Sequence, residues 1–141
     1  MFKKILVGYD GSKGGKAALL GAAEIADRFD GRVTALWVRE PLPRHSDLPG
    51  EFEEEAAAAD EYYQARQKEV ADIAAQFGFS IGCEAQRGHP AMVIVEFAKK
   101  HGYDLVVVGH SDHSELWGRL LGDTADRISD HSPCSVLIVK T

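Results

Sequence analysis

Five short apolar runs, separated by segments with helical spacing, constrain the fold of this chain more than any other feature. The runs cover approximately residues 5–9, 33–38, 80–86, 105–108 and 135–139. Runs of this kind, without regular polar alternation, are typical of strands that are buried on both faces of a parallel sheet. The pattern therefore predicts an α/β fold: one doubly wound domain spanning residues 1–141, with a five-stranded parallel sheet and helices on both faces.

Four helices are expected between these strands. The first has an apolar face and ends near Gly31, and the second covers about residues 53–76. The third begins at Pro90, and the fourth covers about residues 122–130. The buried face of the first helix is expected to contain Ala18, Ala22, Ile25, Ala26 and Phe29. Trp37 and Phe97 are expected in the core, and the proline-rich stretch 41–52 is expected to be a loop.

Composition excludes several classes of protein. The net charge of −6 argues against non-specific binding to nucleic acid or to an anionic membrane surface. No apolar stretch approaches the roughly 20 residues that a membrane span requires, and Lys3 and Lys4 precede only a strand-like run, so no signal peptide is expected. Cys83 and Cys134 lie in strand-like segments and are expected to be reduced thiols of a cytoplasmic protein.

The fourth apolar run leads into a glycine-bearing loop and then a helix. Gly109, Gly118 and Gly122 lie in this stretch, together with Asp112 and Asp123. A strand that runs into such a loop can form a phosphate cradle, because small residues let the backbone approach an anion and the N–H groups of the helix N-terminus face it. Two carboxylates here stand where a phosphate would favour glycine or a hydroxyl.

Three strand ends are expected to meet in one crevice. Ligands of open parallel sheets bind beyond the carboxyl ends of the strands, where Asp10, Val38 and Gly109 stand. Asp10 could accept a hydrogen bond from a ligand, the Val38 backbone could read the edge of a base, and the N–H groups of residues 122–124 could meet phosphates. Alternatively, residues 10–12 simply form a tight turn in which Ser12 caps the first helix.

The opening strand followed by Asp10, Gly11 and Ser12, together with the closing Pro-Cys-Ser-Val-Leu-Ile-Val-Lys of residues 133–140, resembles universal stress proteins of the UspA type. The resemblance covers essentially the whole chain. It implies the strand order 3-2-1-4-5 and a homodimer, often paired through the last strand, residues 135–139. It also implies a role in stress survival or regulation rather than a metabolic reaction, with slow ATP hydrolysis as the most that is expected of catalysis.

ATP-binding members of this family carry the pattern Gly-x2-Gly-x9-Gly-[Ser/Thr]. On this chain the first and third glycines fall on Gly109 and Gly122, whereas Asp112 and Asp123 replace the second glycine and the hydroxyl residue. The spacing is kept, and the phosphate contact is altered. The resemblance implies ligand contacts at Asp10, Gly11, Ser12, Val38, Val108, Gly109, His110, Ser111, Asp112, Gly122, Asp123 and Thr124.

The two loop aspartates leave two functions open. Like charges about 4 Å apart repel by about 1 kcal/mol in water and about 4 kcal/mol at an effective dielectric of 20, which disfavours metal-free ATP. Mg²⁺ or Mn²⁺ could bridge carboxylate and triphosphate, or AMP, cyclic AMP or adenosine could bind instead. The protein is then either a nucleotide-sensing regulatory module or a dimeric interaction protein that binds no nucleotide. His110, Asp112 and His113 lack the spacing of a known zinc site, so no metal site is predicted. No general base or cationic transition-state stabiliser is identifiable in the loop, so no catalytic residue is predicted.

Overall fold

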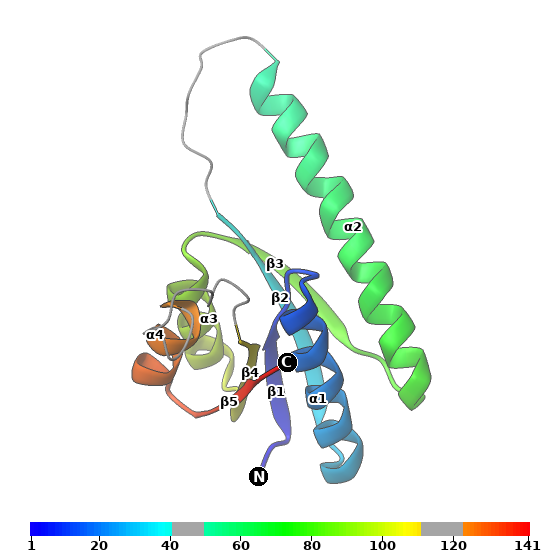
Figure 1. Ribbon diagram of the computed structural model, residues 1–141, viewed down its shortest axis with the longest axis vertical. Helices are drawn as coiled ribbons and strands as arrows, with labels where there is room; N and C mark the ends of the chain where they lie inside the picture. The colour runs from blue at the N-terminus through cyan, green and yellow to red at the C-terminus, as the bar shows by residue number, and fades with distance from the viewer. Residues whose placement is uncertain (41–49, 111–122) are drawn as a thin grey trace.

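The computed structural model describes residues 1–40, 50–110 and 123–141; positions 41–49 and 111–122 lie outside the described part. Strands and helices alternate along the chain (Figure 1). They are β1 (Lys4–Gly8), α1 (Lys13–Phe29), β2 (Arg32–Arg39), α2 (Glu51–Phe77), β3 (Gly82–Arg87), α3 (Pro90–His101), β4 (Leu105–Gly109), α4 (Asp123–His131) and β5 (Ser135–Val139). All strand pairs are parallel, in the order β3-β2-β1-β4-β5, which confirms the predicted fold class and strand order.

Alternate residues of the central strands feed two separate cores, one on each face of the sheet. Ile5 and Val7 of β1 belong to the cluster beneath α1 and α2, whereas Leu6 between them belongs to the cluster beneath α3 and α4. All three side chains are fully buried. The continuous apolar run of β1 is therefore explained by helices that cover both faces, as the sequence predicts.

Element ends differ from the predicted ones by one or two residues. The third strand is Gly82–Arg87, and the fourth helix is Asp123–His131. Trp37 is expected in the core but is only half-buried. It lies near the end of β2 and packs on the rings of Tyr62 and Tyr63. Phe29, expected on the buried face of α1, is 49% exposed and meets Phe2 edge-on at the end of the helix. The half-buried Phe97 packs against the core under α3 and α4.

Only part of α2 covers the sheet. Its C-terminal half buries Val70 and Ala74, while its N-terminal half projects beyond the rest of the domain (Figure 1). None of the helices within the described ranges is long and apolar enough to cross a membrane. The candidate site lies where the inner part of α2 meets the turn after β1.

Candidate functional site

The turn after β1 is built by short local hydrogen bonds. Asp10 Oδ1 accepts a hydrogen bond from the Ser12 backbone N–H at 2.9 Å, and Ser12 Oγ accepts one from the Gly15 N–H at 3.0 Å. Ser12 is the extended N-cap residue of α1, and Gly11 has a φ of 83°, which favours glycine. The turn with a Ser12 cap is therefore present, and it uses only one carboxylate oxygen of Asp10.

Helix α2 holds the outer side of this turn. The Tyr62 hydroxyl donates a hydrogen bond to the Asp10 carbonyl oxygen, and the Arg66 guanidinium lies 4.2 Å from the centre of the Tyr62 ring. A Cβ on Gly11 would lie 2.5 Å from the Arg66 side chain, which would have to move, and the positive φ of Gly11 favours glycine independently. Nothing in the sequence pattern indicates that Tyr62 and Arg66 approach this turn, because they lie more than 50 positions away from it.

A buried tyrosine continues this network beneath the turn. Tyr9, only 3% exposed, donates a hydrogen bond to Glu69 Oε1 at 2.7 Å, and Arg66 donates one to Glu69 Oε2 at 3.0 Å. Arg66 Nε also lies 2.8 Å from Glu69 Oε1, as an ion pair without hydrogen-bond geometry. Burial, followed by the hydrogen bond to the Glu69 carboxylate, raises the pKa of Tyr9 well above its ordinary value. Tyr9 is therefore a neutral donor at physiological pH.

Gly109 lies where the end of β4 closely approaches the backbone of α1. A Cβ built on it would lie 2.2 Å from the carbonyl oxygen of Gly14 in the first turn of α1. A Cβ on Gly14 would in turn lie 2.7 Å from the His110 carbonyl oxygen. Gly109 is expected from the sequence to contact a phosphate, but packing of α1 against the end of β4 already requires glycine there.

The Val38 backbone lies beyond the last residue pair of β1 and β2. The Tyr9 N–H donates to the Leu36 carbonyl at 2.9 Å, so the backbone of Leu36 points toward β1, whereas the Arg39 carbonyl points toward β3, where it accepts from the Gly88 N–H. Because orientation alternates along a strand, the N–H and C=O of Val38 point toward the side of β1. However, β1 ends at Gly8, which pairs with Leu36, so no residue of β1 pairs with Val38.

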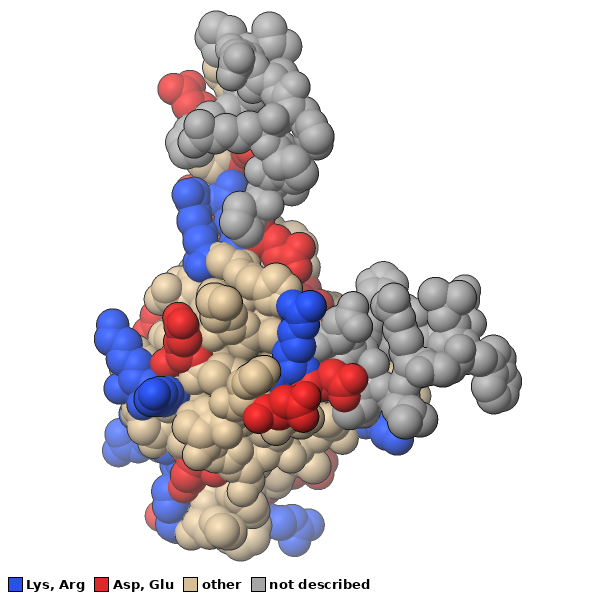
Figure 2. Space-filling view, turned by 90° about the vertical axis from the view of Figure 1, so that its left-hand side faces the viewer, with Lys and Arg blue, Asp and Glu red and all other residues tan. Residues whose placement is uncertain are grey.

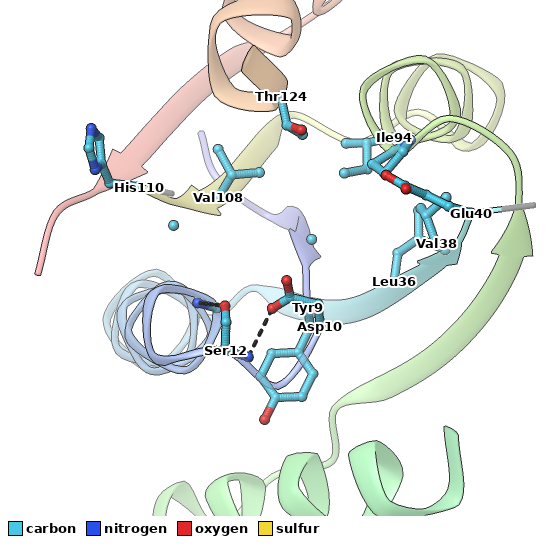
Figure 3. Close-up of a pocket in the computed structure, with 14 residues that line it drawn as sticks. Tyr9, Asp10, Ser12, Leu36, Val38, Glu40, Ile94, Val108, His110 and Thr124 are labelled. Atoms are coloured by element: carbon cyan, nitrogen blue, oxygen red, sulfur yellow. Dashed lines mark hydrogen bonds between the residues drawn. The ribbon is translucent and has the colours of Figure 1, made fainter. Parts of the chain in front are cut away.

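These features surround a crevice of about 580 Å³ at the carboxyl ends of β1, β2 and β4 (Figure 3). The structure brings together at its wall the predicted residues Asp10, Ser12, Val38, Val108, Gly109, His110 and Thr124. Gly11 lies in the adjoining turn but does not line the crevice. Ser111, Asp112 and Gly122 lie outside the described residues, and Asp123 is the first residue of α4, without a described side chain.

Other residues of the wall were not singled out from the sequence. They are Gly8, Tyr9, Gly15, Leu36, Glu40, Pro90 and Ile94. Leu36 and Glu40 could have been found, since they share the two-residue period of Val38 and therefore its face of the strand. Pro90 and Ile94 come from α3, and no local pattern indicates which strand that helix covers.

The described wall of the crevice is acidic. It contains the carboxylates of Asp10 and Glu40 and neither lysine nor arginine. On the face shown in Figure 2, acidic and basic side chains are interspersed, and outside the grey residues no continuous basic surface appears there. In the part of the chain that the structure describes, no group of three or more His, Cys, Asp or Glu side chains could hold a metal ion. Asp112 and His113 of the histidine-bearing loop lie outside that part.

A doubly wound parallel sheet with a crevice beyond the ends of three strands defines an α/β protein of the ligand-binding type. The universal stress protein family model matches residues 1–140. The chain is 37% identical over 142 residues to the universal stress protein MJ0531 of Methanocaldococcus jannaschii, covering 99% of this chain and 83% of that protein. It therefore belongs to the universal stress protein family.

Solved structures agree with this assignment. UspA from Lactobacillus plantarum matches with a TM-score of 0.83 and 28% identity, covering 98% of this chain and 97% of that one. A universal stress protein crystallised in complex with cAMP matches with a TM-score of 0.76 and 28% identity, covering 97% and 96% of the two chains.

Proposed function

We propose that the crevice binds an adenine nucleotide of low charge, AMP or cAMP in preference to ATP, and that the protein is a regulatory module of the stress response. The observation that carries this proposal is the Val38 backbone: its N–H and C=O point toward the side of β1, where they have no strand partner, and Val38 lines a crevice of about 580 Å³. A donor and an acceptor side by side suit the edge of a base. A family member with 28% identity binds cAMP, which supports the same ligand class.

The second oxygen of Asp10 provides a contact for a sugar. Oδ1 is held by the Ser12 N–H, and the other oxygen is directed into the crevice (Figure 3). A carboxylate oxygen accepts hydrogen bonds from hydroxyl groups, so the ribose of a nucleotide suits this position. Asp10 is thus fixed by the turn and still available to a ligand.

The charges of the wall explain the preference for few phosphates. Asp10 and Glu40 line the crevice, and the sequence places Asp112 and Asp123 in and after the loop that follows β4. Each added phosphate charge within about 4 Å of a carboxylate costs about 1–4 kcal/mol, depending on the local dielectric. A divalent cation would offset this repulsion for ATP by binding carboxylate and phosphate oxygens together.

Isothermal titration calorimetry with AMP, cAMP and ATP tests the proposal, with ATP measured both in EDTA and in Mg²⁺. We expect AMP and cAMP to bind at least tenfold more tightly than ATP in EDTA, and Mg²⁺ to recover part of the ATP affinity. Thr124→Trp should abolish binding by filling the crevice, whereas Ser129→Trp, at an exposed position of the same helix, should leave it unchanged. Low-micromolar binding of ATP in EDTA would contradict the charge argument. Absence of binding by all three nucleotides would favour a dimeric interaction protein that binds no nucleotide.

We also propose that two chains associate through β5. This strand lies at an edge of the sheet with β4 as its strand neighbour, and its Leu137 is 37% exposed. An apolar edge strand leaves backbone N–H and C=O groups unpaired, and antiparallel pairing with a second copy would satisfy them in both chains. Light scattering at micromolar concentration should give the mass of a dimer, and Leu137→Lys should shift it toward the monomer. A monomeric mass for the unaltered chain would overturn this proposal.

A further inference from the structure

Glu40 lies at one end of the crevice, at the mouth of its most apolar part. It follows β2 directly and continues the two-residue period of Leu36 and Val38, so these three side chains share the face of the sheet that α3 covers. Figure 3 shows the Glu40 carboxylate beside Val38 and Ile94, at the end of the crevice away from His110. The walls of this end are aliphatic, which suits a flat ring.

The chemistry of this end restricts what the ring can carry. A carboxylate is an acceptor only, so a ligand group that meets Glu40 must donate an N–H or O–H. The described wall contains neither lysine nor arginine to neutralise it. A carbonyl at the same place would set lone pairs against lone pairs, whereas an exocyclic amine would make a charge-assisted hydrogen bond.

We infer that Glu40 is a specificity-determining residue of the crevice: it accepts a hydrogen bond from the exocyclic amine of the base and so selects a 6-aminopurine over a 6-oxopurine. This inference rests on the proposed function, since it requires the base to lie between Val38 and Ile94. It extends that function from the ligand class to the atom that is read. The backbone of Val38 holds the base edge, and Glu40 distinguishes the substituent.

AMP and IMP are suitable probes, because they carry the same ribose and phosphate and differ at the purine ring. Repulsion between the phosphate and any carboxylate is therefore the same for both and cancels in the ratio of their dissociation constants. Hydrogen bonds to a charged group contribute enough for a tenfold to hundredfold preference, and the exposed position of Glu40 places the expectation at the lower end. The unaltered protein should bind AMP about tenfold more tightly than IMP.

Glu40→Gln tests the role of the carboxylate by calorimetry with both nucleotides. An amide can donate to the oxygen of IMP as well as accept from the amine of AMP, so the ratio should fall at least threefold. Any preference for AMP that remains belongs to the Val38 backbone. Glu96→Gln is the matched control: it removes one negative charge from an exposed position of α3 that does not line the crevice, and it should leave the ratio unchanged.

The outcomes separate the two proposals. An AMP to IMP ratio that Glu40→Gln leaves unchanged, or an equal gain in affinity for both nucleotides, would show that Glu40 acts only through its charge and would overturn the inference while the proposed function stands. Failure of the unaltered protein to bind AMP and cAMP alike would overturn both. A ratio that collapses in Glu40→Gln and persists in Glu96→Gln supports the inference.

Discussion

Replacing Gly109 by alanine tests whether this glycine serves the packing of the fold. The added Cβ would lie 2.2 Å from the carbonyl oxygen of Gly14, 2.3 Å from its carbonyl carbon and 2.8 Å from its Cα. All three are backbone atoms of the first turn of α1, so no side chain can rotate away. Gly109 does not have a positive φ, and the whole cost is therefore steric.

The size of the effect follows from these distances. Non-bonded carbon atoms are best separated by about 3.5–4.0 Å, so α1 and the end of β4 must move apart by more than 1 Å. Overpacking in a well-packed interior costs typically about 1–3 kcal/mol, and more where backbone must shift. We expect Gly109→Ala to lower the free energy of unfolding by about 3 kcal/mol.

Urea unfolding of the ligand-free protein measures this cost separately from any ligand contact. Gly82→Ala is the control: its Cβ would lie 3.5 Å from Thr34 Oγ1, an ordinary contact, and its φ is not positive either. This control should change the free energy of unfolding by less than about 0.5 kcal/mol. If Gly109→Ala were equally neutral, the close approach to α1 would not constrain position 109, and its glycine would have to be explained by a ligand.

Three further predictions concern single side chains. The free energy of unfolding should fall as the pH rises above about 10, because Tyr9 ionises there in the unfolded chain but stays protonated in the folded one, where its pKa is raised. Urea titrations should show a weaker fall for Tyr9→Phe. Burial opposes the ionisation of Asp104, but hydrogen bonds from two backbone N–H groups outweigh it and lower the pKa of this carboxyl. Its contribution to the free energy of unfolding is present above about pH 4 and is lost as the pH falls through the folded-state pKa. Asp104→Asn should therefore weaken the acid dependence of stability between about pH 2 and 5 in urea titrations. Tyr62→Phe removes the hydroxyl that donates to Asp10 and should weaken AMP binding severalfold, whereas calorimetry with Tyr63→Phe should show no change, because Tyr63 stacks on the neighbouring tryptophan instead.

The fold could be predicted because its signals are local. The apolar run of β1 and the helical spacing of α1 each lie within one element, and they set the class of fold by themselves. The strand order is less local, and it came from the resemblance to a family. Trp37 shows the limit of composition: a large apolar residue near the end of β2 is expected in the core, but it is half-buried against aromatic side chains of α2.

In the candidate site, too, local contacts could be predicted from the sequence and distant ones could not. Asp10 and Ser12 form a turn whose hydrogen bonds span two or three residues, and this turn can be read directly from the sequence. Tyr62 reaches the same turn across a separation of 52 residues, and nothing local identifies it as a partner of Asp10. Glu40 lies between these cases, since its position follows from the period of β2 once the extent of that strand is known.

The distinction between packing and binding decides which residues carry information about a ligand. Gly109 belongs to the family's nucleotide pattern, yet the backbone of α1 would require glycine there in a protein that binds nothing. Its presence therefore cannot serve as an argument for a ligand. Asp10, Val38 and Glu40 line the crevice, and the second oxygen of Asp10 is directed into it. A ligand hypothesis for this chain therefore depends on the second oxygen of Asp10, the backbone of Val38 and the carboxylate of Glu40. Of these residues, Glu40 is exposed and belongs to neither buried core, so its substitution tests binding with the least effect on the fold.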